Sequence, residues 1–187
     1  MAIENTDLKK GRIFALDDQP YKVIEYRQKV VGRGSSIVNV RIRNLISGQV
    51  INKTLKGNEN IGEADLINKP VTYLYLEGSI YHFMDQSNFE QFSLPEQSIE
   101  DQKTYLKEGD GVSLILFNGS PIAIELPNNL PLKVDYTEDA VKGDTTSAIT
   151  KNATLETGLV VKVPAFIKVG DIIRIDTRKA TYLEREK

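Results

Sequence analysis

The chain has 187 residues, of which 40% are hydrophobic and 27% are charged, so it can bury the core of one large domain or of two to three small ones. It contains no cysteine and one histidine, which excludes disulfides, thiolate catalysis and cysteine-based metal sites and predicts a cytoplasmic protein. The N-terminus lacks an apolar signal core and no apolar run approaches the roughly 20 residues that span a bilayer, so we expect no membrane association.

Strand patterns dominate the first segment, residues 1–64. Residues 12–16 and 21–26 flank a turn-rich break, and residues 37–43 alternate between apolar and polar side chains as a half-buried strand does. A further strand is expected at residues 49–54. We interpret this segment as a small, strongly twisted barrel.

One arginine stands between two glycines, Gly32-Arg33-Gly34, at the predicted tip of the hairpin in this segment. Glycines on both sides let the backbone turn sharply and keep bulky side chains away. The guanidinium of Arg33 could therefore enter a narrow space and contact phosphate, sugar or carbonyl oxygens. The alternative is an ordinary exposed loop.

The second segment, residues 65–127, contains two predicted hairpins, at residues 71–84 and 112–126. The second hairpin turns at Asn118-Gly119, the strongest short-range signal for a type I′ turn. Between the hairpins, Ser98 begins a capping-box pattern that predicts one short helix over residues 98–106. Five or so strands with one intervening helix suit an OB-type barrel.

A break rich in proline and asparagine at residues 127–131 precedes the third segment, residues 128–187. This segment again shows about five short strands, at residues 132–136, 153–155, 158–163, 171–176 and 180–184. The predicted fold is therefore all-β, with three consecutive small β-barrels in an elongated row and domains at 1–64, 65–127 and 128–187.

The net charge of −2 is unevenly distributed along the chain. Residues 1–64 hold 11 Lys/Arg and 7 Asp/Glu (net +4), residues 65–127 hold 3 and 10 (net −7), and residues 128–187 hold 10 and 9 (net +1). This asymmetry favours an arrangement in which the first segment faces a polyanion and the acidic middle segment is kept away from it. The alternative is that like charges cluster by chance on solvated surfaces.

The sequence holds few parts for catalysis. His82 lies in an aromatic strand segment, where histidine is more often a packed residue than a base, and neither a P-loop nor a dinucleotide fingerprint is present. We therefore expect a binding protein that is not an enzyme and has no metal site.

Basic residues suited to phosphate contacts concentrate in the first segment, in the set Lys29, Arg33, Arg41, Arg43, Lys53 and Lys56. In the third segment, Gly143-Asp144-Thr145 offers an unusual turn, a carboxylate and a hydroxyl to base edges. A turn that satisfies its own hydrogen bonds is the alternative for this loop.

The chain resembles the bacterial translation elongation factor P family over its whole length. The most specific match follows the family's signature spacing in the third segment, at Lys151-Asn152-Ala153, Gly158, Val161, Val163-Pro164, Ile167 and Gly170. Gly143-Asp144-Thr145 stands upstream of it as in the family. Further likenesses are Tyr73-Leu74-Tyr75, Phe89-Glu90-Gln91 and the region from Asp176 to Tyr182.

The resemblance implies an L-shaped molecule, with a KOW/SH3-like barrel followed by two OB-type barrels, that works as a monomer. It implies binding to both ribosomal subunits beside the peptidyl-tRNA when synthesis stalls on consecutive prolines. Arg33, between Gly32 and Gly34, would reach the acceptor end of that tRNA. Contacts with the small subunit and the exit site would come from Gly143, Asp144, Thr145, Tyr182 and Arg185.

Two departures from the family pattern stand out. Many members carry a modified lysine at the tip, whereas this chain has Arg33. A branch with arginine there attaches rhamnose but often has asparagine where this chain has Gly34, so two states stay open, an unmodified Arg33 and one rhamnosylated by a glycosyltransferase. No other cofactor is implied. Residues 146–150 replace a loop that is often glycine-rich in relatives.

Three alternatives to this function stay open. The elongation-factor-P-like paralog also has arginine at the tip, but it usually has a longer tip loop. A general RNA-binding β-barrel protein with no ribosomal role is the second alternative. An enzyme is the third, and the missing nucleophile and metal ligands oppose it.

Overall fold

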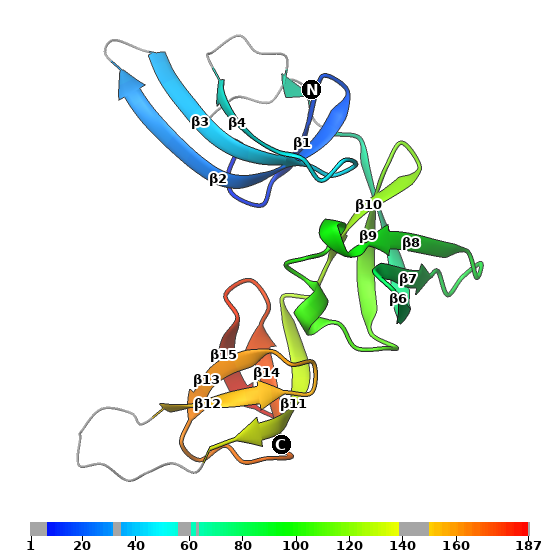
Figure 1. The fold of residues 1–187 in the computed structure, drawn as a ribbon, viewed down its shortest axis with the longest axis vertical. Coiled ribbons are helices and arrows are strands. Elements are labelled where there is room, and N and C mark those ends of the chain that lie inside the picture. Colours follow the sequence, from blue (N-terminus) through cyan, green and yellow to red (C-terminus); the bar gives the residue numbers. More distant parts are fainter. Residues whose placement is uncertain (1–6, 32–34, 56–60, 63, 139–149, 187) are drawn as a thin grey trace.

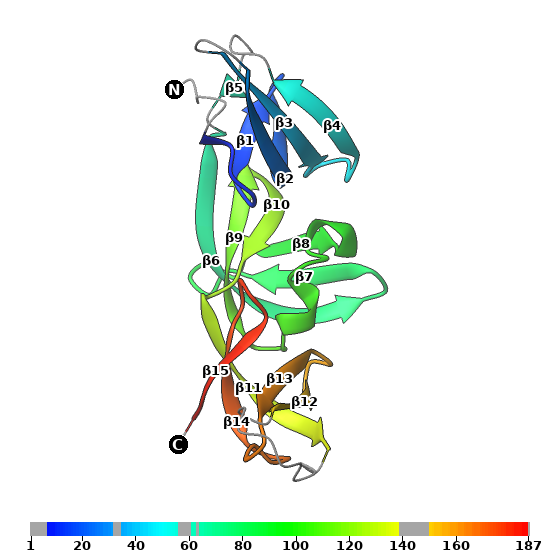
Figure 2. The ribbon, with the colours of Figure 1, turned by 90° about the vertical axis from the view of Figure 1, so that its left-hand side faces the viewer.

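The computed structural model describes residues 7–31, 35–55, 61–62, 64–138 and 150–186, and at residues 29–31 and 35–36 it describes the backbone alone. Within these ranges the regular structure consists of strands and two short 3₁₀ turns. The strands form three five-stranded sheets that follow one another along the long axis (Figure 1; Figure 2). This confirms the predicted all-β class and the row of three modules.

The first sheet has the strand order β4-β3-β2-β1-β5. Its strands are β1 (Ile13–Leu16), β2 (Gln19–Val31), β3 (Ser35–Asn44), β4 (Val50–Leu55) and β5 (Ile61–Gly62). Apolar side chains alternate toward one face, where Phe14, Val38, Ile42 and Leu55 are fully buried. The short strand β5, which was not predicted, pairs with β1.

The second sheet has the order β10-β9-β6-β7-β8. Its strands are β6 (Leu66–Glu77), β7 (Ile80–Met84), β8 (Gln91–Pro95), β9 (Gly111–Phe117) and β10 (Ser120–Glu125). β9 and β10 turn at Asn118 and Gly119, both with positive φ (49° and 79°), as the sequence predicted for this turn. β8 was not predicted, although Phe92 and Leu94 alternate inward along it.

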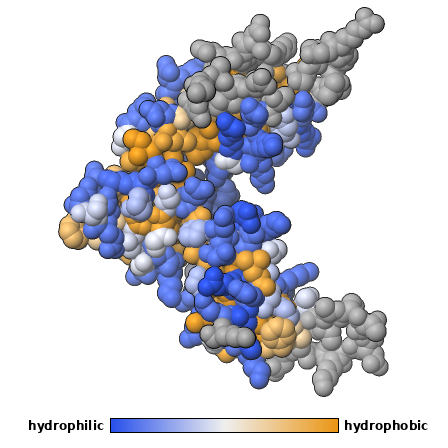
Figure 3. Space-filling model, turned by 180° about the vertical axis from the view of Figure 1, so that it is seen from behind, coloured by the Kyte–Doolittle hydropathy of each residue, from blue (hydrophilic) through white to orange (hydrophobic). Residues whose placement is uncertain are grey.

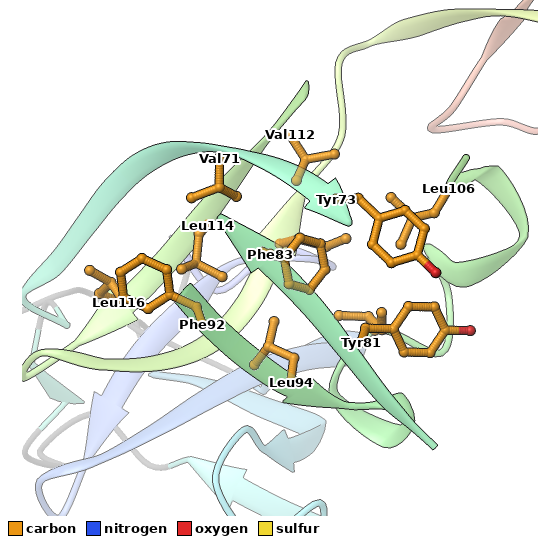
Figure 4. Close-up of a cluster of buried hydrophobic side chains, with 12 residues drawn as sticks. Val71, Tyr73, Tyr81, Phe83, Phe92, Leu94, Leu106, Val112, Leu114 and Leu116 are labelled. Carbon is orange, nitrogen blue, oxygen red and sulfur yellow. The ribbon is translucent and has the colours of Figure 1, made fainter. Parts of the chain in front are cut away.

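The core of the second sheet gathers aromatic side chains from β6, β7 and β8 (Figure 4). Phe83 is fully buried, and its ring centroid lies 5.6 Å from that of Tyr73, which lies 5.7 Å from Tyr81. The phenol oxygens of Tyr73 and Tyr81 point away from the centre of the cluster. The rings therefore fill the core while their polar ends reach its edge.

The helix predicted over residues 98–106 is wrong. The structure has two 3₁₀ turns there, Glu96–Ser98 and Lys103–Tyr105, and neither has a side-chain cap. Ile99 and Leu106 pack into the core of the second sheet, but Tyr105 packs into the core of the third. Ser98 ends the first turn instead of beginning a helix, and Ile99 has a φ of −126°, outside the helical region, so the capping box does not form and the segment turns twice.

The third sheet has the order β13-β12-β11-β14-β15. Its strands are β11 (Asn129–Thr137), β12 (Thr150–Leu155), β13 (Val160–Pro164), β14 (Ile172–Asp176) and β15 (Thr181–Arg185). β11 pairs with both β12 and β14 and so joins the two halves of the sheet. The break predicted at residues 127–131 is shorter in the structure, because β11 already begins at Asn129.

The first and second sheets meet through a shared apolar cluster, here called the first junction. Its buried members are Leu45, Ala64, Ile115, Phe117, Ile122 and Ala123. Figure 3 shows apolar surface passing from the first module onto the second where they meet. Because these side chains come from both modules, separating the modules would expose all of them to water.

The second and third sheets meet at a second junction. Tyr105 enters the core of the third sheet, and Leu126 packs against the cores of both sheets. Lys107 Nζ lies 3.0 Å from Glu156 Oε2 across this junction. The middle module is therefore attached to its neighbour on each side by side-chain packing as well as by the chain itself.

Truncating Phe83 to alanine should destabilise the middle module by about 3–5 kcal/mol, because a fully buried ring leaves a cavity that its neighbours fill only in part. Amide hydrogen exchange over residues 66–125 measures this. The control is Ile80→Ala on the same strand, at a side chain that is 44% exposed, where protection should hardly change. Equal loss of protection in both variants would contradict the assigned core.

Candidate functional site

Many of the predicted site residues lie outside the described residues. These are Gly32, Arg33, Gly34, Lys56, Gly143, Asp144 and Thr145. Lys29 lies in β2, where its backbone pairs with Ile37. The structure describes the side chains of Arg41, Arg43, Tyr182 and Arg185.

The hairpin of β2 and β3 extends beyond the rest of the first sheet. Its pairing continues to Val31 opposite Ser35, so three residues, 32–34, connect the strands. On the other side of β3, the described residues of β4 pair with β3 from Val38 onward, up to Leu55. The end of the hairpin thus continues about 10 Å past the described part of β4, at roughly 3.3 Å per residue, and is here called the ribbon of β2 and β3. This ribbon carries the segment that holds Arg33.

The outer face of β2, β3 and β4 is hollowed into an open groove of about 470 Å³. Strand alternation explains its lining, because Arg41 lies between Glu25 and Asn52 across the sheet and Arg27 lies opposite Asn39. The lining residues are Glu25, Arg27, Asn39, Val40, Arg41, Val50, Asn52, Lys53 and Thr54. Sequence reasoning singled out Arg41 and Lys53 but missed Arg27 and the polar neighbours. The available signal was the period-two spacing of Arg27 from Glu25 along β2 and of Asn39 from Arg41 along β3.

The groove is electropositive, because its lining holds three basic side chains and one carboxylate, Glu25. Arg41 Nη1 lies 3.3 Å from Glu25 Oε1, and Arg27 Nη2 lies 3.8 Å from Glu25 Oε2. Both arginines are at least half exposed. Exposed pairs of this kind are weak, so a phosphate group could compete with Glu25 for either guanidinium.

Arg43 lies at the first junction and not in the groove. Its Nη2 is 3.2 Å from Glu100 Oε2, and its Nη1 donates a hydrogen bond to the carbonyl oxygen of Gln97 at 3.4 Å. Nearby, Lys22 Nζ is 3.9 Å from Asp101 Oδ2 across the same junction, and burial lowers the pKa of Lys22. A phosphate contact by Arg43, as predicted, would require it to exchange partners.

Tyr182 and Arg185 lie on β15 of the third sheet. Tyr182 packs against the core of that sheet. The guanidinium of Arg185 lies 5.8 Å from the ring centroid of Phe166 and 3.7 Å from Asp171 Oδ2. The two predicted groups, on the first and third sheets, are therefore not brought together in one site, because the second sheet separates them (Figure 1).

The turn that leads into β15 is fixed by Asp176. Its buried carboxylate accepts hydrogen bonds from Arg178, from the backbone N at 2.9 Å and from Nη2 at 2.9 Å. These bonds lower the pKa of Asp176 to about 2. The ionised carboxylate thus holds the turn that positions Tyr182.

The single histidine is a packed strand residue. His82 stacks on Tyr75 with ring centroids 4.7 Å apart, and its Nδ1 lies 3.1 Å from the hydroxyl of Ser93. In the part of the chain that the structure describes, no three potential metal ligands come together. The same residues include no helix with the length and apolar character needed to cross a membrane.

Family models match all three modules. The Elongation factor P KOW-like domain matches residues 4–61, the Elongation factor P OB domain matches residues 66–124, and the model described as Elongation factor P, C-terminal matches residues 130–185. The first two matches agree with the barrel types expected for the first and second modules.

Curated relatives match over nearly their full length. Elongation factor P of Moorella thermoacetica is 42% identical over 183 residues, covering 98% of this chain and 99% of that protein. Elongation factor P of Oleidesulfovibrio alaskensis is 39% identical over 181 residues, covering 97% and 98%. Among solved structures, a eukaryotic translation initiation factor 5A from Methanococcus jannaschii matches with a TM-score of 0.48 at 15% identity, covering 67% of this chain and 92% of that one.

Replacing Asp176 with asparagine should remove a stabilisation that depends on pH. The pKa of Asp176 falls from 3.8 to about 2 on folding, so its contribution is complete above about pH 4 and is lost as pH falls toward 2. Thermal unfolding of the third module should show a gap between wild type and Asp176→Asn at neutral pH that closes below pH 3. A gap that is independent of pH would contradict the role of the ionised carboxylate.

Proposed function

The chain belongs to the elongation factor P family of translation factors, and we propose that it binds the bacterial ribosome beside the peptidyl-tRNA and stimulates peptide-bond formation at consecutive prolines. The observation that supports this most directly is the ribbon of β2 and β3, which continues past the described part of β4 toward residues 32–34. A long, narrow ribbon suits delivery of one side chain into a confined reaction centre. Such a factor acts in the cytoplasm.

The proposed mechanism is positioning of a reactant. Proline is a poor partner in peptide transfer because its ring fixes φ and restricts the approach of the reacting groups. A factor that braces the donor tRNA lowers the entropy lost in reaching the geometry of attack. Each tenfold gain in rate corresponds to a decrease of about 1.4 kcal/mol in the activation free energy, so a small gain in the positioning of the tRNA is sufficient to accelerate the reaction. The ribosome forms the bond, and Arg33 would contact the acceptor end of the peptidyl-tRNA.

The other predicted residues have supporting roles in this proposal. Lys29, Arg41 and Lys56 would contact phosphates of tRNA or ribosomal RNA, and the groove adds Arg27 to this set. Arg43 would do so only after leaving Glu100. Small-subunit and exit-site contacts are assigned to Gly143, Asp144, Thr145, Tyr182 and Arg185.

We also propose that the three sheets are the centres of domains at residues 1–64, 65–127 and 128–187, acting together in one monomer. The connection of three residues between β2 and β3 favours elongation factor P over its paralog with a longer tip loop. Arg33 is either unmodified or rhamnosylated by a glycosyltransferase. Intact mass and peptide mapping across residues 29–41 of natively expressed protein distinguish the two states.

Replacing Arg33 with alanine should abolish the acceleration of proline-run synthesis in a reconstituted translation system, because the side chain that reaches the tRNA is lost. Synthesis from a template without proline runs is the first control. The second is Arg12→Ala, at an exposed arginine of the same module that donates to the backbone oxygen of Asp7. Rescue by Arg33→Ala at the wild-type rate would contradict the site.

A general RNA-binding protein would behave differently in the same assay. Its binding would be sensitive to salt with any RNA, and it would give no gain on proline-run templates.

Replacing Arg41 with alanine should weaken ribosome binding uniformly and flatten the dependence of log affinity on log salt by about one unit, because one phosphate contact is lost. Binding titrations between 50 and 200 mM salt, a range typical for such contacts, measure the slope. The control is Arg174→Ala on the third sheet, at a side chain paired with Glu186 at 2.9 Å, where no change in slope is expected. An unchanged slope for Arg41→Ala would contradict a phosphate contact by Arg41.

A further inference from the structure

The turn between β7 and β8 holds an exposed aromatic residue in an unfavourable backbone conformation. Phe89 is 71% exposed, the highest value among the large apolar side chains that the structure describes. Its φ is +59°, in the left-handed region that non-glycine residues rarely adopt. Packing within the chain explains neither feature, because most of the side chain contacts solvent.

The turn around Phe89 is held by a dense network of bonds. The buried carboxylate of Asp85 accepts hydrogen bonds from the backbone N and the hydroxyl of Ser87, both at 2.7 Å, and lies 3.1 Å from Lys69 Nζ. Lys69 Nζ also lies 2.7 Å from Glu90 Oε2. The backbone N of Phe89 donates to the backbone oxygen of Asp85 at 2.8 Å. The network therefore fixes the backbone that carries Phe89, which lowers the entropy lost when this turn binds a partner.

This turn lies on the outer side of the bent molecule, away from the first and third modules (Figure 1). Apolar surface reaches the outermost edge of the middle module there (Figure 3). The ribbon of β2 and β3 extends toward the opposite side (Figure 1). A contact at Phe89 would therefore leave the ribbon and its groove accessible.

The charge of the middle module indicates the kind of partner. Residues 65–127 hold ten carboxylates and three lysines. Each of these lysines is already in an ion pair, Lys69 with Asp85 and Glu90, Lys103 with Glu96, and Lys107 with Glu156. At the turn itself one lysine, Lys69, is shared by two carboxylates, Asp85 and Glu90, so the net charge there is negative and favours a cation over a phosphate. An aromatic ring beside carboxylates suits arginine or lysine, which can lie over the ring face.

We propose that Phe89 is the anchor of a docking site for a basic, arginine- or lysine-rich protein segment on the ribosome. This inference rests on the proposed function, since it takes the ribosome as the source of the segment. The backbone strain at Phe89 is then retained because the ring binds a partner and not because it stabilises the fold.

The melting temperature and the ribosome affinity of two variants distinguish a role of Phe89 in binding a partner from a role in stabilising the fold. Asparagine tolerates the left-handed region, so Phe89→Asn should melt at the wild-type temperature or above it. The same variant should bind purified bacterial 70S ribosomes carrying peptidyl-prolyl-tRNA about tenfold more weakly, the loss expected for a buried aromatic anchor. Phe89→Tyr, which keeps the ring, should match wild type in both measurements.

A photoreactive benzoylphenylalanine at position 89 identifies the partner on the same ribosomes. Crosslinks to a basic segment of a ribosomal protein support the proposal. Crosslinks to ribosomal RNA, to a second copy of this chain or to nothing overturn it, as does wild-type affinity of Phe89→Asn. If the wild-type chain itself fails to bind these ribosomes, the proposed function fails with it, whereas the other negative outcomes remove the Phe89 site alone.

Discussion

The structure depends on the first junction, where apolar side chains of two modules share one cluster. Leu45 from the first module packs with Ile115, Phe117 and Ile122 from the second, and the Arg43–Glu100 pair lies beside them. Domains within one chain move relative to each other unless their interface is apolar and well packed. Because this interface is apolar, the ribbon of β2 and β3 has a defined position relative to the middle module. The second junction extends the same constraint to the third module.

Charge supplements this constraint by giving each module a different kind of surface. The groove of the first module has three basic side chains and one carboxylate, whereas the middle module, residues 65–127, has three lysines and ten carboxylates. A polyanion therefore approaches the first module in preference to the second. Fixed modules with unequal charge are suited to orienting a large ligand, because only one arrangement satisfies both shape and charge.

Local patterns predicted most of the fold. The Asn118-Gly119 turn and the alternation along β3 follow from rules that act over a few residues, and both are confirmed. The helix expected at Ser98 is absent, because the chain leaves the helical conformation at Ile99, and the two short turns direct Ile99 and Tyr105 into different cores, which is a tertiary property. Arg43 shows the same limit at the candidate site. Its place on β3 was predictable, but its contact with Glu100 depends on how two modules meet.

Interdomain distance tests the central claim most directly, and the absence of cysteine makes paired labelling simple. Spin labels attached at Thr54→Cys on β4 and Gln91→Cys on β8, which are both exposed positions, measure the distance between the first and second modules. The account predicts one narrow distance distribution in the otherwise native chain. It predicts a broad distribution when Ile122→Ala and Arg43→Ala are added. A broad distribution with the junction intact would contradict the account.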